Sequence, residues 1–169
     1  PGPLPPGVAV DRLLTVTSEP RNNRLMAAMR ALGLAEESSR GFDRMWAAMI
    51  GSGREAPEVV TTETAVSVIF AGANPDLEFV RGIHALSKRF GKPISAVGTL
   101  IILRHLHESP LISLQTAKVK TQQATNEARE LLDSLEELGV LARLGNADDW
   151  SLSSETRELL GGTETGEAL

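Results

Sequence analysis

A run of amide, hydroxyl and basic side chains lies between residues 118 and 129. Gln and Asn can each form two hydrogen bonds to adenine, Arg can do so to guanine, and Thr or Lys can contact phosphate oxygens. The run consists of Lys118, Lys120, Gln122, Gln123, Thr125, Asn126 and Arg129. These residue types predict a local surface for double-stranded DNA, with the two lysines on the backbone and the other side chains facing bases.

The residues that follow predict the helix that would carry these side chains. Leucines at positions 131, 132, 135 and 138, together with Ala128, form one apolar face over residues 124–138, and Gly139 ends the helix. The polar residues therefore lie early on the helix and the apolar residues late. This division is typical of a recognition helix whose C-terminal half packs inside the domain.

Acidic residues on the same helix favour another interpretation. They are Glu127, Glu130, Asp133, Glu136 and Glu137. Carboxylates repel phosphates, and Glu127 would lie close to the DNA. The sequence therefore leaves open a protein-interaction or dimerisation module without affinity for DNA.

The elements around this helix follow the order of a winged helix-turn-helix domain. A helix from Asn74 to Gly91 is followed by a strongly apolar helix in "SAVGTLIILRHLHES", which must be buried. The strand "LIS", the short helix "LQTAKVK", the helix over 124–138 and a β-hairpin in "VLARLGNADDWSLS" complete the order. Arg143 would face phosphate from the wing, where two aspartates oppose deep insertion into the minor groove. We expect this domain over residues 74–152 and a flexible tail over 153–169.

Residues 1–72 predict a smaller unit of helices and a hairpin, which makes the fold class α+β. The opening "PGPLPPGV" is rich in Pro and Gly and predicts a loop, and "RNNRLMAAMRALG" predicts a packed helix. A second helix has an apolar face at helical spacing, and "PEVVTTETAVSVIFAG" alternates as a β-hairpin. The apolar faces of the two helices consist of Leu25, Met26, Met29, Leu32 and of Phe42, Met45, Trp46, Met49, Ile50.

The composition excludes several kinds of protein. The 169 residues include no Cys, which excludes disulfides and cysteine metal sites, and His84, His105 and His107 lack the spacing of a metal pair. The net charge of −5 argues against a broad surface for polyanions, so any contact with DNA must be local. No apolar run could cross a membrane. We expect a cytoplasmic segment of a larger protein, without a metal or cofactor.

The N-terminal motifs resemble those of bacterial and archaeal regulators known as RecG-like or "ATP-dependent DNA helicase-related" proteins. In that family an "NPG" loop with "LP" and Gly precedes "RN", a helix, "LGL", an acid, a "GSGI" turn and "RM". The matching residues here are Pro1, Gly2, Leu4, Pro5, Gly7, Arg21, Asn22, Leu32 to Leu34, Glu36 or Glu37, Gly41, Arg44 and Met45. The resemblance covers roughly residues 1 to 60.

The resemblance implies a Schlafen-type AlbA module, a divergent ATPase-like module of the GHKL type and a C-terminal winged helix in the whole protein. This chain would hold only the C-terminal part of the ATPase-like module. "SSRGF" stands where the family has "GSGI", and Arg40 would hinder a close approach of backbone to phosphate. We therefore expect no competent ATP binding by this chain, although a nucleotide-sensing role that needs a preceding half remains an alternative.

No residues form a catalytic constellation in the sequence. There is no G-x-x-x-x-G-K-[ST] phosphate loop and no nucleophile elbow, so we expect the chain not to be an enzyme. The prediction is a transcriptional regulator that binds double-stranded DNA through its winged helix, as a homodimer and without a membrane.

Overall fold

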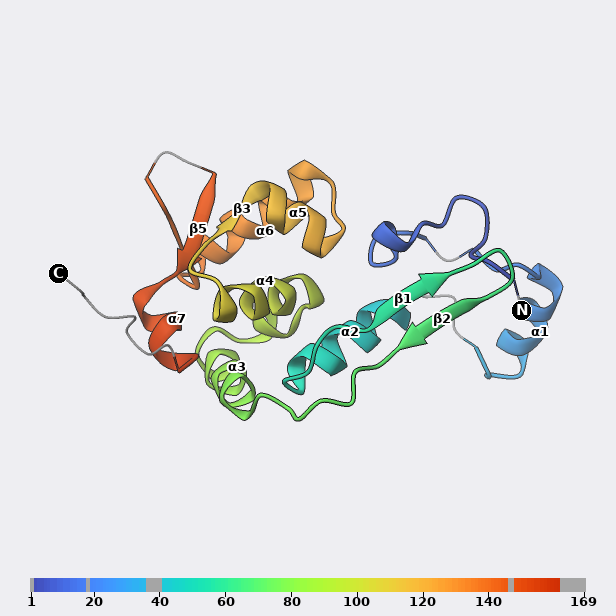
Figure 1. The fold of residues 1–169 in the computed structure, drawn as a ribbon, viewed down its shortest axis with the longest axis horizontal. Helices are drawn as coiled ribbons and strands as arrows, with labels where there is room; N and C mark the ends of the chain where they lie inside the picture. Colours follow the sequence, from blue (N-terminus) through green and yellow to red (C-terminus); the bar gives the residue numbers. More distant parts are fainter. Residues whose placement is uncertain (1, 18, 36–40, 146–147, 162–169) are drawn as a thin grey trace.

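The computed structural model describes residues 2–17, 19–35, 41–145 and 148–161. Its N-terminal part, up to residue 70, contains a 3-10 helix, two α-helices and a hairpin (Figure 1). These are η1 (Val10–Arg12), α1 (Asn23–Ala31), α2 (Gly41–Gly51), β1 (Glu58–Thr61) and β2 (Val66–Ile69). The C-terminal part contains α3 (Leu77–Phe90), η2 (Lys92–Ser95), α4 (Val97–Glu108), β3 (Ile112–Ser113), α5 (Leu114–Thr121), α6 (Thr125–Glu137), β4 (Leu141–Arg143), β5 (Asp149–Leu152) and α7 (Ser154–Leu159). The chain is therefore mixed in helix and sheet, as predicted.

Helix α2 joins the two parts through its apolar face. Trp46 and Ile50 are buried, and α2 packs against α4. Phe42 and Trp46 meet edge to face, with 5.8 Å between ring centroids. The hairpin pairs Val59 with Val68 in an antiparallel register, as the alternating sequence predicted. The helical spacing of the apolar residues thus located the packed face of α2 correctly.

Helix α1 forms where predicted but is not packed. The Asn22 side chain caps it by accepting a hydrogen bond from the Leu25 N–H at 2.9 Å. No residue of α1 is buried, and the side chains of Leu25 and Leu32 are 57% and 72% exposed. The expectation of a packed helix is wrong. The helix lies at one end of the molecule (Figure 1), and none of its residues is buried.

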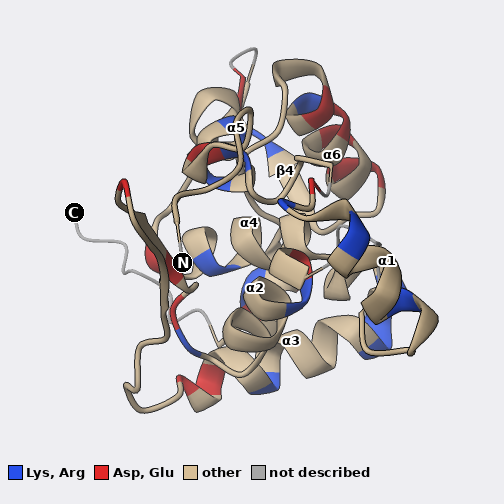
Figure 2. Ribbon diagram, turned by 90° about the vertical axis from the view of Figure 1, so that its right-hand side faces the viewer, with Lys and Arg blue, Asp and Glu red and all other residues tan. Residues whose placement is uncertain are grey.

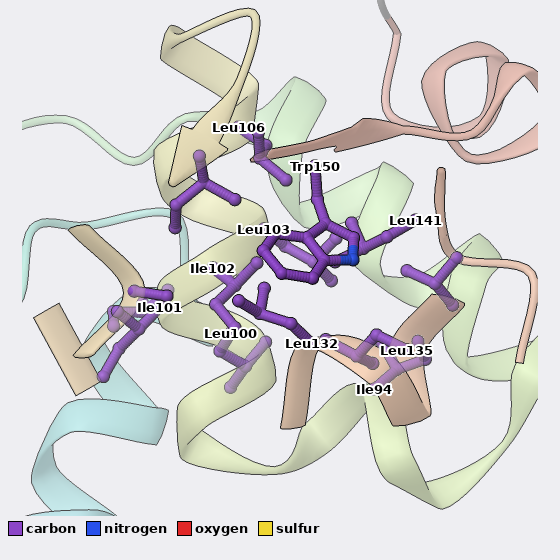
Figure 3. Close-up of a cluster of buried hydrophobic side chains, with 14 of the residues drawn as sticks. Ile94, Leu100, Ile101, Ile102, Leu103, Leu106, Leu132, Leu135, Leu141 and Trp150 are labelled. Atoms are coloured by element: carbon purple, nitrogen blue, oxygen red, sulfur yellow. The ribbon is translucent and has the colours of Figure 1, made fainter. Parts of the chain in front are cut away.

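The C-terminal part is built around one apolar cluster (Figure 3). Trp150 on β5, Leu103 on α4 and Leu132 on α6 have no exposed surface. The sheet has the order β3-β5-β4 and is antiparallel throughout, with Ile112 opposite Trp150 and Leu141 opposite Leu152. The predicted burial of α4 and of the leucines on α6 is confirmed for Leu132 and Leu135, with Leu131 and Leu138 partly buried.

Helix α7 corrects the prediction of a flexible tail from residue 153. The Ser153 side chain caps it by accepting from the Thr156 N–H, and Leu160 is 1% exposed. The helix packs against α3 at Gly82, where an added Cβ would lie 2.7 Å from the Leu160 Cα. Gly82 therefore permits this close approach. Residues 162–169 lie outside the described residues, as do residues 36–40 and the turn residues 146 and 147, to which parts of our predictions referred.

A polar cluster also connects the two parts. The Asp76 N–H donates to the Gly53 carbonyl at 2.8 Å, and Arg104 on α4 donates to Asp76 at 2.9 Å and to Glu55 at 2.7 Å. A hydrogen bond from the Phe79 N–H lowers the pKa of Asp76 most, and bonding from Arg104 lowers it further. The N-terminal and C-terminal parts are thus joined by polar as well as apolar contacts.

Candidate nucleic-acid interface

Most of the predicted DNA-contacting residues lie on α5, on the first half of α6 or in the turn between them, whereas Arg143 lies on β4. Ser113 caps α5 by accepting from the Thr116 N–H, and Gln122 ends the helix in the left-handed conformation with φ 58. No other non-glycine residue in the described ranges has a positive φ. The turn therefore adopts a costly backbone conformation that its contacts must hold in place.

Gln122 faces the N-terminal part rather than solvent. Its side-chain oxygen accepts a hydrogen bond from the Leu14 N–H at 3.0 Å, and its carbonyl accepts one from the Thr15 hydroxyl at 3.1 Å. These contacts stabilise the left-handed turn. They also engage the Gln122 side chain, which the sequence predicted would face a base. Gln122 consequently acts as an anchor between residues more than 100 positions apart.

The start of α6 presents a different pair of residues to solvent. Thr125 and Asn126 are exposed on the first turn, whereas Gln123 is half-buried, and its Oε1 accepts no hydrogen bond from the described residues. Glu127 is bent back toward the helix start, where its carboxylate accepts from the Ala124 N–H at 2.9 Å. Its negative charge thus lies at the positive end of the helix dipole.

Lys118 and Lys120 lie in the last turn of α5, the first half-buried and the second exposed. Neither lysine forms an ion pair with a carboxylate in the described ranges. Burial lowers the pKa of His105, and the nearby charge of Lys120 lowers it further. Both ammonium groups are therefore available to an external anion.

Arg129 and Arg143, by contrast, are occupied by carboxylates. Arg129 makes a two-point contact with Asp148, which directly precedes β5, at 2.8 and 2.7 Å, and this contact lowers the pKa of Asp148. Arg143 bonds Asp133 and Glu136 and lies over the Trp150 ring, 4.5 Å from its centroid. A bond from the Trp150 indole lowers the pKa of Glu136 most, followed by the bond from Arg143. Arg129 on α6 and Arg143 on β4 are thus paired with carboxylates within the protein.

A hollow of about 780 Å³ lies between residues 7–17 and the α5–α6 turn. Arg12 and Lys118 bring positive charge to its lining, and Asp11 and Glu127 bring negative charge. Thr15, Thr17 and Thr125 add hydroxyl groups. The N-terminal part therefore contributes directly to the surface around the predicted recognition helix.

Other kinds of site have little support in the described ranges. They contain no group of three or more His, Asp or Glu side chains arranged to hold a metal ion. They also contain no helix that is long and apolar enough to cross a membrane. Acidic residues follow one another along α6 (Figure 2), as the sequence indicated.

Comparison with known proteins gives a family match for the N-terminal part and a structural likeness that covers most of the chain. Residues 1–70 match the family described as "Putative ATP-dependent DNA helicase recG C-terminal". The crystal structure of the DIP2311 protein from Corynebacterium diphtheriae is similar over 94% of this chain, with a TM-score of 0.76 and 23% sequence identity. The chain spans 34% of the length of that protein, and no curated protein matches it. The family match agrees with the predicted RecG-like resemblance, and the structural likeness concerns the fold alone.

Two of the predicted site residues, Gln122 and Arg129, have partners within the protein that the sequence did not predict. The sequence assigned Gln122 to bases, yet the residue holds Leu14 and Thr15, which no local pattern links to it. It also did not foresee the pairing of Arg129 with Asp148, although the acidic wing turn was noted. Of the remaining residues, Lys118 and Thr125 line one hollow, while Lys120 in the last turn of α5 and Asn126 in the first turn of α6 are exposed.

Proposed function

We propose that residues 74–152 form a winged helix-turn-helix that binds double-stranded DNA. The order of helices and strands supports this proposal, with α4, α5 and α6 followed by a hairpin whose β5 lies between β3 and β4. The observation that carries it is the first turn of α6, which exposes Thr125 and Asn126, with Thr125 lining the same hollow as Lys118, a lysine without a carboxylate partner in the described ranges. Asn126 would contact a base, and Lys118 and Lys120 would contact phosphates.

The roles of the remaining predicted residues change accordingly. Gln122 would position the turn instead of facing a base, and Gln123 would contribute little because its carbonyl oxygen is buried. Arg129 and Arg143 would reach DNA only after releasing their carboxylate partners. The contact surface would thus be small, which agrees with the net charge of −5.

We further infer that residues 1–72 are the end of a divergent ATPase-like module in a larger regulator of transcription. The family match over residues 1–70 supports a RecG-like origin for this part. A homodimer would supply two winged helices to two half-sites, which is a common route to specificity. ATP binding, if the whole protein has it, would need segments that precede this chain.

A protein-interaction module is the second candidate, and the charges of α6 favour it. Five carboxylates lie along this helix, and the two arginines closest to them are already paired. A basic protein surface would find partners there, whereas phosphates would be repelled. This alternative requires α6 to bind a partner through its acidic side rather than through its first turn.

Fluorescence anisotropy with labelled duplexes selected from a random library tests the first candidate. The wild type should bind selected duplexes better than random ones, and affinity should fall as salt rises. Asn126→Ala should remove the preference for sequence, and Lys118→Ala should weaken binding to all duplexes alike. Ser134→Ala is the control, because Ser134 lies on the same helix, about two and a half turns from Thr125. Equal affinity for selected and random duplexes at low salt would support the protein-interaction module instead.

A further inference from the structure

The segment around Arg12 is held firmly against the α5–α6 turn. Leu13 is 2% exposed and belongs to the apolar core, while Leu14 and Thr15 both hydrogen-bond Gln122. Two polar contacts and one buried leucine therefore fix the backbone on the C-terminal side of Arg12. Its guanidinium consequently starts from a defined position beside the turn, within reach of the hollow that it lines together with Lys118.

The charges around this hollow leave cations available. Arg12 is exposed and, like Lys118, forms no ion pair with a carboxylate of the described ranges. Of the two acids in the lining, Glu127 is engaged by the Ala124 N–H, and Asp11 precedes Arg12 in η1. The lining thus includes two cations without carboxylate partners in the described ranges and several hydroxyl groups, together with the charges of Asp11 and Glu127.

We propose that Arg12 contacts the phosphate backbone of bound DNA together with Lys118, so that the DNA-binding surface includes the N-terminal part of the chain. This inference rests on the proposed function and adds a residue to it. The physical reason is the distribution of free cations. The arginines of α6 and the wing are neutralised by carboxylates, whereas Arg12, Lys118 and Lys120 are not. Phosphate contacts should therefore concentrate on the side of α6 that faces residues 7–17.

A surface of this kind would link the two parts of the chain through DNA. Gln122 both shapes the turn before α6 and holds the segment that carries Arg12, so the spacing between Arg12 and Asn126 is set by the same residue. DNA that contacts both residues would be bound in one orientation relative to the N-terminal part. The N-terminal part would then influence affinity without binding any nucleotide itself.

The test is a salt titration with a labelled duplex of two helical turns, roughly 20 base pairs, selected for binding to the wild type. Each phosphate contact contributes about 0.9 to the slope of log affinity against log salt, which is about eightfold in affinity at roughly 0.1 M salt. Arg12→Ala should show that loss of slope and affinity, and Arg12→Lys should keep the slope. Arg24→Ala is the matched control, since Arg24 is an exposed arginine of α1 with no ion pair in the described ranges.

The outcomes separate this inference from the function on which it rests. In one outcome, Lys118→Ala has a reduced salt slope, whereas Arg12→Ala cannot be distinguished from Arg24→Ala. This outcome would overturn the role of Arg12 and leave DNA binding in place. Tighter binding by Arg12→Ala would also overturn it, because residues 7–17 would then hinder DNA. No duplex binding by the wild type would overturn both proposals. Thermal melting followed by circular dichroism confirms that each variant is folded.

Discussion

Replacing Asp148 by Asn removes the charge that holds Arg129 while keeping the size of the side chain. In the wild type, the Asp148 carboxylate occupies both outer nitrogens of the Arg129 guanidinium, at 2.8 and 2.7 Å. Phosphate and guanine bind arginine in the same two-point manner, so under the proposed function DNA would compete with Asp148 for the Arg129 guanidinium. Asp148→Asn should therefore strengthen DNA binding.

The size of the effect follows from the contacts. Both partners are largely exposed, with side-chain exposures of 39% for Arg129 and 52% for Asp148, so DNA can displace the carboxylate. One arginine made available adds one phosphate contact, which raises the salt slope by about 0.9 and the affinity by up to about eightfold at roughly 0.1 M salt. Arg143 should contribute less, because Asp133 and Glu136 still hold it.

The assay is fluorescence anisotropy over a salt series, with Asp149→Asn as the control. Asp149 is the next residue and its loss changes the net charge equally, but its side chain makes no ion pair within the described ranges. Any difference between the two variants therefore reports the release of Arg129 and not the change in net charge. Equal slopes for Asp148→Asn and Asp149→Asn would refute the competition between Asp148 and DNA. If the double variant Asp148→Asn, Arg129→Ala lacks the increase in DNA affinity, Arg129 is the arginine responsible for that increase.

Three further predictions concern stability. Leu132→Ala should lower the free energy of unfolding by about 2–5 kcal/mol, measured by urea denaturation, because Leu132 is fully buried beside Trp150; Leu131→Ala, at a partly buried position, should cost less. Gly82→Ala should destabilise by about 1–3 kcal/mol and reduce the protection of α7 in hydrogen exchange, because the new methyl would meet the Leu160 backbone; unchanged protection would argue against the packing of α7 on α3. The lowered pKa of Asp76 means that its charge stabilises the fold above the unfolded pKa, and that this contribution is lost as pH falls through the folded pKa. Asp76→Asn should therefore be less stable than the wild type near pH 7, and the difference in stability should shrink below about pH 4. A difference in stability that does not depend on pH would contradict this role of Asp76.

The sequence by itself determined the local elements and their inner faces. Apolar residues at helical spacing located the packed sides of α2, α4 and α6, and alternation located the hairpin of β1 and β2. The caps at Asn22 and Ser113 and the left-handed Gly139, with φ 83, mark the ends of helices. These features depend on residues within a few positions of each other, so the order of residues is sufficient to predict them.

The tertiary structure decided which residues meet. The apolar stripe of α1 has the same spacing as that of α2, yet only α2 has a partner to cover it, so the pattern could not separate the exposed helix from the packed one. Helix α7 exists because Gly82 on α3 leaves room for Leu160, a contact across more than 70 positions.

The candidate site likewise combines features that the sequence predicts with contacts that only the folded chain creates. The sequence located the polar surface at the α5–α6 turn, because residue types there differ from those of a buried helix. It could not assign each side chain, since Gln122 bonds Leu14 and Arg129 bonds Asp148 through contacts that only the folded chain creates. The charges available to a ligand were therefore fixed by tertiary pairing, which neutralised Arg129 and Arg143 and left Arg12, a residue of the N-terminal part, beside Lys118.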